Sequence, residues 1–555
     1  MENNNAFGKA KILKDPIYGY ISIPREYMNN IVDTAEFQRL RRIMQTSYSP
    51  LYSSALHNRF VHSLGVFYLG TIAAKSLIAA NTEKKIIDTQ KMEKLAEVYK
   101  LACLLHDVGH APFSHTGEVF YDRKVLAERL KEVVGTNSLK DYIDSIGQSK
   151  GAANHEVMSA NIGIERFSDF IGDKEDQEFF ARCITGYMYD MNNTEDQIKN
   201  CFISMLNSKV IDVDRLDYLI RDAYSSGYDT INIDYMRLLN SLTIVKANEC
   251  KVAFKKNAIS VIENVVYAHD AEKKWIQNHP VVVYEMFLLQ RIITQLNEII
   301  VGEDKNKKIS LFSEQTLGTE RVTFPSGRTV SLLSDDDIVY LCKDMLNNEV
   351  CEEYFDRSKR RHPIWKSESE YKAYIGSICL KGELKNEFQK LMNELTDQGG
   401  DHVSYIIIND EFENKLKQEK EIFEKMLEKK GISLSYEVYE QGLNKKMLLA
   451  KYLREEATKR GVKFDFVILK ASVFESDFSK EGLGNTCIVL DDSNKVYKLK
   501  EVCSVLTAQH LEDKDDFYYI FYKRPKDVEG FPNMSVFCRK FFEVVTKDMN
   551  EVTEI

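Results

Sequence analysis

The sequence lacks the features that mark several large classes of protein. Its 555 residues include nine prolines and no Gly/Ser-rich tract, which argues against long disordered linkers. The ten cysteines form no CxxC pair, so we expect reduced thiols in a cytoplasmic protein. No run of about 18 apolar residues is present, and the start, MENNNAFGKAKILKDP, has no apolar core. We therefore expect no membrane-spanning segment and no secretory signal.

An excess of positive charge is also missing. The net charge is −10, which speaks against a protein that coats nucleic acid non-specifically, although a local basic pocket is compatible with it. Hydrophobic residues make up 44% and charged residues 29%, as in ordinary globular proteins. A chain of this length is too long for one small core, so two or three units are expected.

Periodicity predicts a mainly α protein, with a helical core and a smaller α+β C-terminal lobe. In residues 1–50, DPIYGYISIP predicts a turn and a hairpin, followed by a helix. Residues 51–310 have mostly helical periodicity and strong apolar faces. Residues 311–555 mix a charged amphipathic helix with strand-like segments such as KFDFVILKA and DDFYYIFYK. We expect an insertion near residues 367–450.

The unusual feature is LLHDVGHAPFSH at residues 104–115, which contains three histidines. Residues 57–115 hold five of the eleven histidines of the chain. His106 and Asp107 are adjacent, and neighbours deep within a helix point about 100° apart. At a helix end they can converge, and Gly109 and Pro112 indicate that a helix ends here. His62 lies on an earlier predicted helix, three residues after Arg59 and on the same face.

These residues suggest a metal site that needs a fourth ligand. The segment VIDVDRLDYLIRDAYSSG offers four aspartates: Asp212, Asp214, Asp217 and Asp222. Imidazoles and carboxylates together suit Mn, Fe, Mg, Zn or Ni better than a thiolate-seeking metal. The alternative is a core histidine that caps a helix, next to a solvated aspartate. That explanation would be preferred for one histidine, and it is weaker for three residues together.

Several segments resemble one family. HNRFVHSLGV, LLHDVGHAPFSH, NHE and IDVDRLDYLIRDAYSSG are similar to the HD-domain deoxynucleoside triphosphate triphosphohydrolases, which include bacterial dNTPases and the animal SAM-and-HD-domain enzyme. The resemblance covers residues 15–300 well and weakens afterwards. It implies a divalent metal ion, a dNTP substrate that is split into deoxynucleoside and triphosphate, and a homo-oligomer. A nucleotide effector is a further option in this family, as are roles in limiting dNTP pools and in antiviral or phage defence.

Carried over by position, the resemblance assigns roles to individual residues. It makes His62, His106, Asp107 and Asp214 the metal ligands. It places the acid–base residues at His110, His115, Glu118, His155 and Asp212, with His115 and Asp212 supplying the proton to the leaving sugar oxygen. Substrate contacts fall on Gln45, Arg59, Arg215, Tyr218, Asp222, Lys273 and Gln277. Without the resemblance, His155 would be read as an exposed loop residue and each arginine as a surface residue.

Departures from the family pattern concern the sugar more than the hydrolysis. Thr46 and Gln277 stand where animal enzymes have Leu and Tyr, and His269 replaces an arginine, for which Lys273 could supply charge. The sequence leaves two rival functions open. One is an HD phosphohydrolase acting on another nucleotide, such as a ribonucleoside triphosphate, a monophosphate or a cyclic nucleotide. The other is a nucleotide-sensing subunit without catalytic activity.

Overall fold

The computed structural model describes most of the chain and divides it into two compact units. The described residues are 10–135, 151–190, 193–208, 211–228, 232–246, 249–302, 310–376, 383–397, 403–430, 434–471, 481–490, 495–503, 516–525, 531 and 536–541. Unit 1 comprises residues 1–276, 291–346 and 475–511, and unit 2 comprises residues 277–290, 347–474 and 512–555. We describe each unit by itself.

Unit 1 begins with the hairpin that the sequence predicts. Strand β1 (Ala10–Asp15) pairs antiparallel with β2 (Gly19–Pro24). The Asp15 carboxylate closes the turn by accepting hydrogen bonds from the backbone N–H groups of Ile17 and Tyr18. The predicted helix is instead a series of short helical turns, α1 (Arg25–Tyr27), η1 (Met28–Val32), α2 (Ala35–Arg39) and η2 (Leu40–Arg42).

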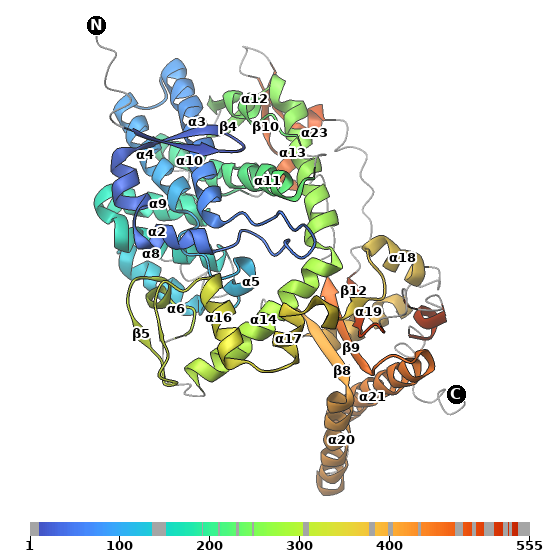
Figure 1. Ribbon diagram of the computed structural model, residues 1–555. Helices are drawn as coiled ribbons and strands as arrows, with labels where there is room; N and C mark the ends of the chain where they lie inside the picture. Colours follow the sequence, from blue (N-terminus) through green and yellow to red (C-terminus); the bar gives the residue numbers. More distant parts are fainter. Residues whose placement is uncertain are drawn as a thin grey trace. The chain divides into compact units, whose positions relative to one another are not determined.

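The core of unit 1 is a helical bundle, so the predicted mainly α fold is correct (Figure 1). Its long central helix, α3 (Arg59–Lys84), starts at Asn58, whose side chain accepts a hydrogen bond from the Val61 N–H. The helices that follow are α4 (Thr89–Leu105), α5 (His115–Glu118), α6 (Arg123–Val134), α8 (Asn154–Ile171), α9 (Lys174–Thr185), α10 (Thr194–Leu206), α11 (Val213–Ser226), α12 (Tyr235–Asn240) and α13 (Ile259–Glu272).

Helix α3 is long and apolar enough to cross a membrane by length and composition alone. However, 61% of its most apolar window is buried within the structure, and core helices of globular proteins pass the same test. Buried members include Leu64, Phe67, Leu69 and Leu77, each no more than 5% exposed. Their hydrophobicity is therefore used in packing, and the absence of a membrane span stays a prediction.

Segments far apart in the sequence complete unit 1. A four-stranded sheet has the order β11-β10-β4-β3, made from β3 (Leu242–Lys246), β4 (Cys250–Lys255), β10 (Cys487–Val489) and β11 (Val496–Lys498). Strands β4 and β10 pair parallel. The predicted Ser-Gly hairpin is present as β5 (Val322–Thr323) and β6 (Thr329–Val330), and α15 (Glu314–Leu317) and α16 (Asp335–Met345) flank it. The C-terminal region thus returns to the helical unit, which the boundaries read from the sequence did not anticipate.

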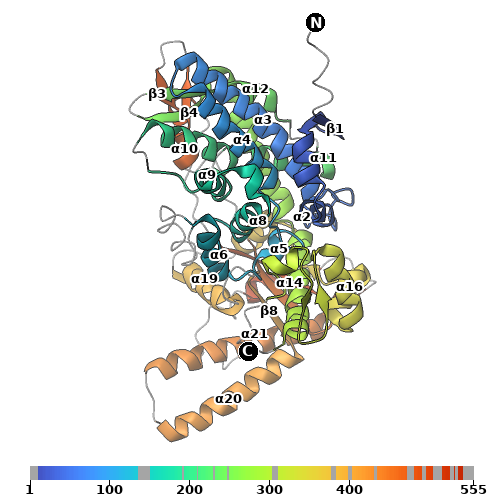
Figure 2. The ribbon, with the colours of Figure 1, turned by 90° about the vertical axis from the view of Figure 1, so that its left-hand side faces the viewer.

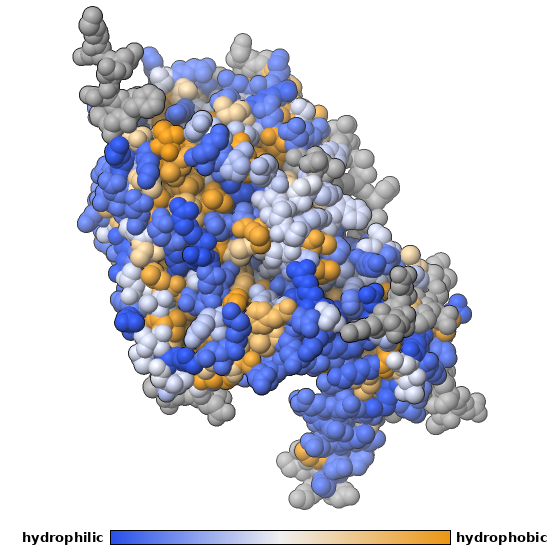
Figure 3. Space-filling view, in the orientation of Figure 1, coloured by the Kyte–Doolittle hydropathy of each residue, from blue (hydrophilic) through white to orange (hydrophobic). Residues whose placement is uncertain are grey.

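Unit 2 is the smaller α+β unit. Its sheet has the order β7-β12-β9-β8, with β7 (His362–Pro363), β8 (Tyr405–Asn409), β9 (Asp465–Ala471) and β12 (Phe517–Tyr522). Its helices include α17 (Glu349–Phe355), α18 (Glu368–Gly376), α19 (Glu383–Thr396), α20 (Asp410–Lys430) and α21 (Leu434–Arg460). Helices α20 and α21 extend away from this sheet (Figure 2). Figure 3 shows α20 as a mostly hydrophilic surface, as its charged sequence predicts.

The helix after Pro280 was expected to offer an oligomer contact. This helix, α14 (Pro280–Val301), has most of its large apolar side chains buried within the chain, among them Phe287, Ile292, Ile293 and Leu296 at no more than 1% exposed. Of its apolar residues, Ile299 is exposed, at 45%. The apolar character of α14 therefore gives no support for an oligomer contact, and oligomerisation stays a prediction.

Candidate metal centre and active site

Three helices of unit 1 bring the predicted metal ligands together. His62 lies in the first turns of α3, His106 caps the C-terminus of α4, and Asp214 lies in the first turn of α11. Helix α11 can approach α3 closely because residue 65 is glycine: a Cβ at Gly65 would overlap the Asp217 carboxylate. Helix α4 ends at Leu105, close to where the sequence indicated a helix end. This end allows His106 and Asp107 to face the same space.

The distances define a compact cluster. The ligand atoms of His62, His106 and Asp214 all lie within 4.8 Å of one another. The His62 Nε2 is 3.3 Å from the His106 Nε2 and 3.0 Å from Asp214 Oδ1. Asp107 adjoins both rings, with Oδ2 3.5 Å from His62 Nε2 and Oδ1 3.4 Å from His106 Nε2. Two imidazoles and two carboxylates thus surround one small space.

The hydrogen bonds on the outer sides of the rings show that this space suits a cation. The His106 Nδ1 lies 3.0 Å from the Cys103 carbonyl oxygen, so Nδ1 carries the proton and Nε2 presents a lone pair. His62 Nδ1 lies 2.8 Å from Asp217 Oδ2, which favours the same tautomer. Burial lowers the pKa of His62, but hydrogen bonds to Asp214 and Asp217 outweigh burial and raise the pKa to about 10. A divalent ion would replace that second proton.

Arg59 is turned toward the same cluster. Its Nη1 donates to Asp107 Oδ2 at 2.9 Å and its Nε donates to Ser114 Oγ at 2.9 Å. The side chain is almost fully buried, so this is not a surface arginine. Burial raises the pKa of Asp107, but Arg59, His106 and His110 outweigh it and hold the pKa well below its usual range. Arg59 therefore keeps Asp107 ionised next to the two imidazoles.

A second cluster, the His–Glu cluster, adjoins the first and consists of His110, His115, Glu118 and His155. Glu118 Oε1 lies 2.8 Å from His115 Nδ1 and 3.3 Å from His110 Nδ1, and Glu118 Oε2 lies 2.9 Å from His155 Nδ1. The rings of His110 and His155 stack at 4.0 Å. His110 Nε2 lies 3.2 Å from Asp107 Oδ1, so one imidazole connects the two clusters.

Burial separates the roles that these imidazoles can take. His110 and His155 are buried, whereas the side chain of His115 is 65% exposed. Burial lowers the pKa of His155, but Glu118 outweighs it and raises the pKa to about 9. Burial, with Arg59 and His155, holds the pKa of His110 well below its usual range. His155 is therefore a charged residue of the site and not the exposed loop residue that the sequence alone suggested.

Among the predicted sugar-binding residues, Tyr218 and Asp222 share α11 with Asp214, and the Gln45 carbonyl oxygen accepts a hydrogen bond from Arg59 Nη2 at 3.3 Å. Asp222 has a partner that the sequence did not nominate. Asp222 Oδ1 is 2.6 Å from the Nε2 of His57, and both side chains are buried. Gln45 is 5% exposed, and its side-chain oxygen makes no hydrogen bond within the described residues. Tyr218 lies on α11 one turn after Asp214 and is half-buried.

For the remaining predicted residues the structure gives local contacts or positions in the chain. Asp212 caps α11 by accepting a hydrogen bond from the Arg215 N–H, and burial raises its pKa to about 7. His115 Nδ1 pairs with Glu118, and the predicted joint role of His115 with Asp212 stays a prediction. Lys273 starts the short helix η4 (Lys273–Gln277) at the end of unit 1. Gln277 is the first residue of unit 2, so its position relative to the metal cluster is not described.

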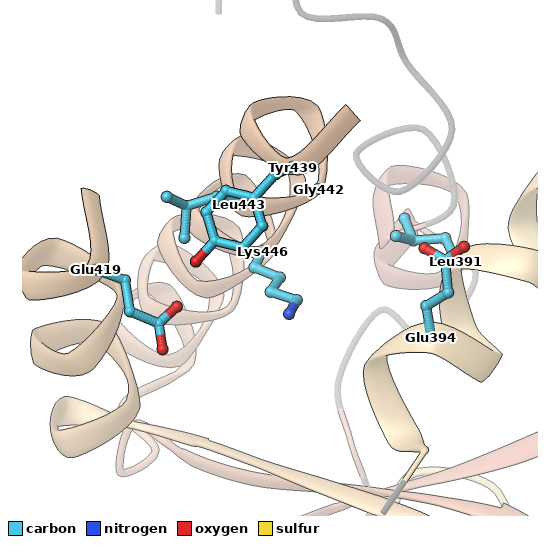
Figure 4. Close-up of a pocket in the computed structure, with 7 residues that line it drawn as sticks. All are labelled: Leu391, Glu394, Glu419, Tyr439, Gly442, Leu443 and Lys446. Atoms are coloured by element: carbon cyan, nitrogen blue, oxygen red, sulfur yellow. The ribbon is translucent and has the colours of Figure 1, made fainter. Parts of the chain in front are cut away.

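A separate hollow in unit 2 is lined by Leu391, Glu394, Glu419, Tyr439, Gly442, Leu443 and Lys446. Figure 4 shows Leu391 and Glu394, from α19, facing side chains of α20 and α21. None of these residues was nominated by the sequence, and the hollow holds no histidine cluster. Among the described residues, both groups of side chains that could hold a metal ion lie in unit 1.

Comparisons with known proteins agree with this placement. Residues 59–170 match the model of the HD domain, a span that holds three of the four predicted ligands. An uncharacterized protein YwfO of Bacillus subtilis is 26% identical over 298 residues, which are 53% of this chain and 58% of that protein. A deoxynucleoside triphosphate triphosphohydrolase SAMHD1 homolog of Dictyostelium discoideum is 26% identical over 305 residues, 53% of this chain and 51% of that protein.

Two further similarities extend this comparison. The deoxynucleoside triphosphate triphosphohydrolase SAMHD1 of Xenopus laevis is 31% identical over 259 residues, 44% of this chain and 38% of that protein. The chain thus spans about half the length, or less, of these curated relatives. The crystal structure of a hypothetical protein from Aquifex aeolicus has a TM-score of 0.50 at 18% identity, and the match covers 96% of this chain and 99% of that one. This last likeness concerns the fold alone.

Proposed function

We propose that this chain, which carries an HD domain and is related to deoxynucleoside triphosphate triphosphohydrolases, is a metal-dependent hydrolase of deoxynucleoside triphosphates. The products would be a deoxynucleoside and inorganic triphosphate. The observation that carries the proposal is the link between the two clusters: His110 Nε2 lies 3.2 Å from Asp107 Oδ1, next to the two imidazole lone pairs. The proposed cation site and the proton-carrying groups therefore adjoin each other at Asp107 and His110.

The metal would be held by His62, His106, Asp107 and Asp214. A divalent cation in this position supplies Lewis-acid polarisation of a phosphate oxygen. Nitrogen and carboxylate ligands are compatible with Mn, Mg, Fe, Ni or Zn. Arg59, which is held beside Asp107, supplies fixed positive charge near a polyphosphate, and Arg215 and Lys273 are the further candidates for this role.

The leaving group of the proposed reaction is a sugar oxygen, which needs a proton. His115 is the member of the His–Glu cluster that is largely exposed and thus accessible to a substrate. Glu118 Oε1, 2.8 Å from His115 Nδ1, would orient the ring so that Nε2 faces the substrate. We propose that His115 donates this proton, that Glu118 orients it, and that the charged His155 keeps the Glu118 carboxylate ionised, while His110 connects Glu118 to Asp107. Asp222 and Gln45 would bind the sugar 3′-hydroxyl, with Tyr218 packed on the sugar.

Product analysis tests the proposal. The purified chain is stripped of metal, reloaded separately with Mn, Mg, Fe, Ni or Zn, and offered each of the four dNTPs and the four NTPs. We expect deoxynucleoside and triphosphate in equal amounts. Release of phosphate or diphosphate, or turnover of monophosphates or cyclic nucleotides, would assign a different HD phosphohydrolase activity. Tight dNTP binding without turnover under every metal would favour a nucleotide-sensing subunit. Light scattering with and without dNTPs tests the proposed homo-oligomer and the proposed nucleotide effector.

A further inference from the structure

Two segments of the proposed active site meet at a residue that comes from a distant part of the chain. Asp335 is the first residue of α16 and is 5% exposed. Its Oδ2 accepts a hydrogen bond from the Met44 N–H at 2.8 Å, directly before Gln45. Its Oδ1 accepts one from the Phe113 N–H at 2.6 Å, in the loop between His110 and His115. One carboxylate therefore joins the Gln45 segment to the loop of catalytic histidines.

The loop that Asp335 holds has a backbone conformation that needs support. Phe113 and Ser114 both have positive φ, at 58° and 53°, which residues other than glycine rarely adopt. Such conformations persist when surrounding contacts fix them. Ser114 Oγ donates to the Met44 carbonyl oxygen and accepts from Arg59 Nε, so this strained point contacts the backbone of Met44, the residue whose N–H donates to Asp335.

Arg39 supports the same arrangement from the other side. Its Nη2 donates to the carbonyl oxygens of Val108 and His110, at 3.0 and 2.8 Å. Its Nη1 donates to the Leu333 carbonyl oxygen at 2.9 Å, two residues before Asp335. The segment at residues 333–335 is therefore attached to the catalytic loop at two places, by Arg39 and by Asp335.

A buried carboxylate at this position is costly for the fold. Burial raises the pKa of Asp335 to about 7, although Met44, Phe113 and Arg39 oppose that rise. A group whose charged form is disfavoured in the folded state lowers stability where it is ionised. An apolar residue or a serine would avoid this cost at the start of a helix. A function in holding the two segments accounts for the carboxylate better than stability does.

We infer that Asp335 is a positioning residue of the proposed active site, which fixes the Gln45 segment against the His110–His115 loop through its two carboxylate oxygens. The inference rests on the proposed function for its effect on turnover, whereas its structural part stands independently. Displacements of about 1 Å at catalytic groups can lower rates about a hundredfold. Asp335 would therefore control kcat without touching the substrate or the metal.

The test compares Asp335→Asn with Asp336→Asn at pH 8. Both variants remove one negative charge from the first turn of α16, but Asp336 is exposed and pairs with Arg42 at the surface, with both side chains almost 70% exposed. In Asp335→Asn we expect faster amide hydrogen exchange in peptides that contain Met44 and Phe113. We expect kcat to fall about 10- to 100-fold with a smaller change in KM and with unchanged metal content. Asp336→Asn should match the wild type in all three measurements.

A second variant, Asp335→Ser, keeps the test decisive if the asparagine variant folds poorly, because serine is smaller and leaves the helix cap at Ser334 intact. A folded Asp335 variant with wild-type kcat and wild-type exchange at both peptides would overturn the inference. Loss of protection from hydrogen exchange throughout unit 1 in both Asp335→Asn and Asp335→Ser would also overturn the inference, because Asp335 would then be a general folding residue. Absence of turnover in the wild type would instead count against the proposed function, and the exchange measurement would still decide the structural part.

Discussion

Asp217 Oδ2 lies 2.8 Å from His62 Nδ1, the ring nitrogen opposite the one that faces His106 and Asp214. The same carboxylate accepts hydrogen bonds from Tyr18 Oη at 2.7 Å and from Arg221 Nε at 2.8 Å, and it is fully buried. It is therefore held ionised, and its pKa is about 2, because Arg221 and His62 outweigh its burial. An ionised Asp217 keeps the His62 proton on Nδ1 and leaves Nε2 as the ligand atom.

Asp217→Asn should consequently weaken metal binding without removing a ligand. An asparagine can rotate its NH2 group toward His62 Nδ1, which moves the ring proton to Nε2 and blocks the lone pair. We expect metal affinity to fall about 10- to 100-fold, measured by competition with a chelator. Tyr18→Phe, which removes one hydrogen bond to the same carboxylate, should have a smaller effect. An unchanged metal affinity in Asp217→Asn would show that the tautomer does not depend on this residue.

Metal removal should lower stability in the wild type and not in ligand variants. A cation that binds only the folded protein stabilises it by about 2.7 kcal/mol at a hundred times its dissociation constant. We expect a chelator to lower the wild-type Tm, and we expect His106→Ala and Asp107→Ala to bind no metal, to show no turnover and to have a Tm that does not respond to metal. Full activity of either variant at low metal concentration would contradict the assigned ligands.

The sequence could nominate His106 and Asp107 as ligand candidates because their arrangement depends on a local feature, the end of a helix. His106 and Asp107 face one space since α4 ends where Gly109 and Pro112 indicated. Spacing could not choose among the aspartates of α11. Asp214 and Asp217 are three residues apart on one face of that helix, and they contact opposite nitrogens of the same ring. The choice of Asp214 came from the family resemblance, and the structure gives Asp217 a different role.

Contacts between distant segments could not be predicted in the same way. Asp335 is more than 200 residues away from Phe113 in the chain, and no local pattern connects the two. His57 could have been found, because it lies two residues before Arg59 in the segment that carries the resemblance. The parallel pairing of β4 with β10 joins residues 253–255 to residues 487–489, and each strand is too short for its sequence pattern to specify a partner.

His57 should influence the proposed recognition of the sugar 3′-hydroxyl. His57 Nε2 and Asp222 Oδ1 are 2.6 Å apart, so His57 fixes the carboxylate that we propose binds this hydroxyl. In His57→Ala we expect kcat/KM for dNTPs to fall about tenfold, as for the loss of one oriented hydrogen bond to a charged group. Dideoxynucleoside triphosphates, which lack the 3′-hydroxyl, should be affected much less. An equal loss for both substrates would indicate a general structural defect.

The raised pKa of Asp335 predicts that the stability of the protein depends on pH. Its folded pKa of about 7 exceeds the ordinary value of 3.8, chiefly because of burial, with Asp336 adding to the rise and Arg39 opposing it. The folded state therefore retains a proton that the unfolded state loses, so stability falls as the pH rises through this range and is constant above it. Relative to Asp335→Asn, the wild type should lose roughly 3 kcal/mol between pH 5 and pH 8. Denaturant unfolding of both proteins at several pH values measures this change, and a wild-type free energy of unfolding that stays constant or rises with pH relative to Asp335→Asn would contradict the argument.

Discrimination against ribose should be weaker than in the animal enzymes of the family. Selectivity requires the pocket to refuse the extra 2′-hydroxyl, and an apolar wall does so by only about a hundredfold. The buried Thr46 Oγ1 makes no hydrogen bond within the described residues and could pair with that hydroxyl. Gln277 stands at a position where the resemblance gives the animal enzymes a tyrosine, and its contribution to the same pocket is part of this prediction.

We expect dNTPs to remain the better substrates, because Tyr218 is retained, but by a reduced margin. The measurement is kcat/KM for dGTP against GTP and for dATP against ATP, in the wild type, in Thr46→Leu and in Thr46→Leu/Gln277→Tyr. Leucine removes the hydroxyl that could pair with the ribose and fills the same space with apolar atoms, so selectivity should rise in the single variant and rise further in the double variant. If the wild type hydrolyses no ribonucleotide and neither variant changes the ratio, polar groups at these two positions do not determine sugar selectivity.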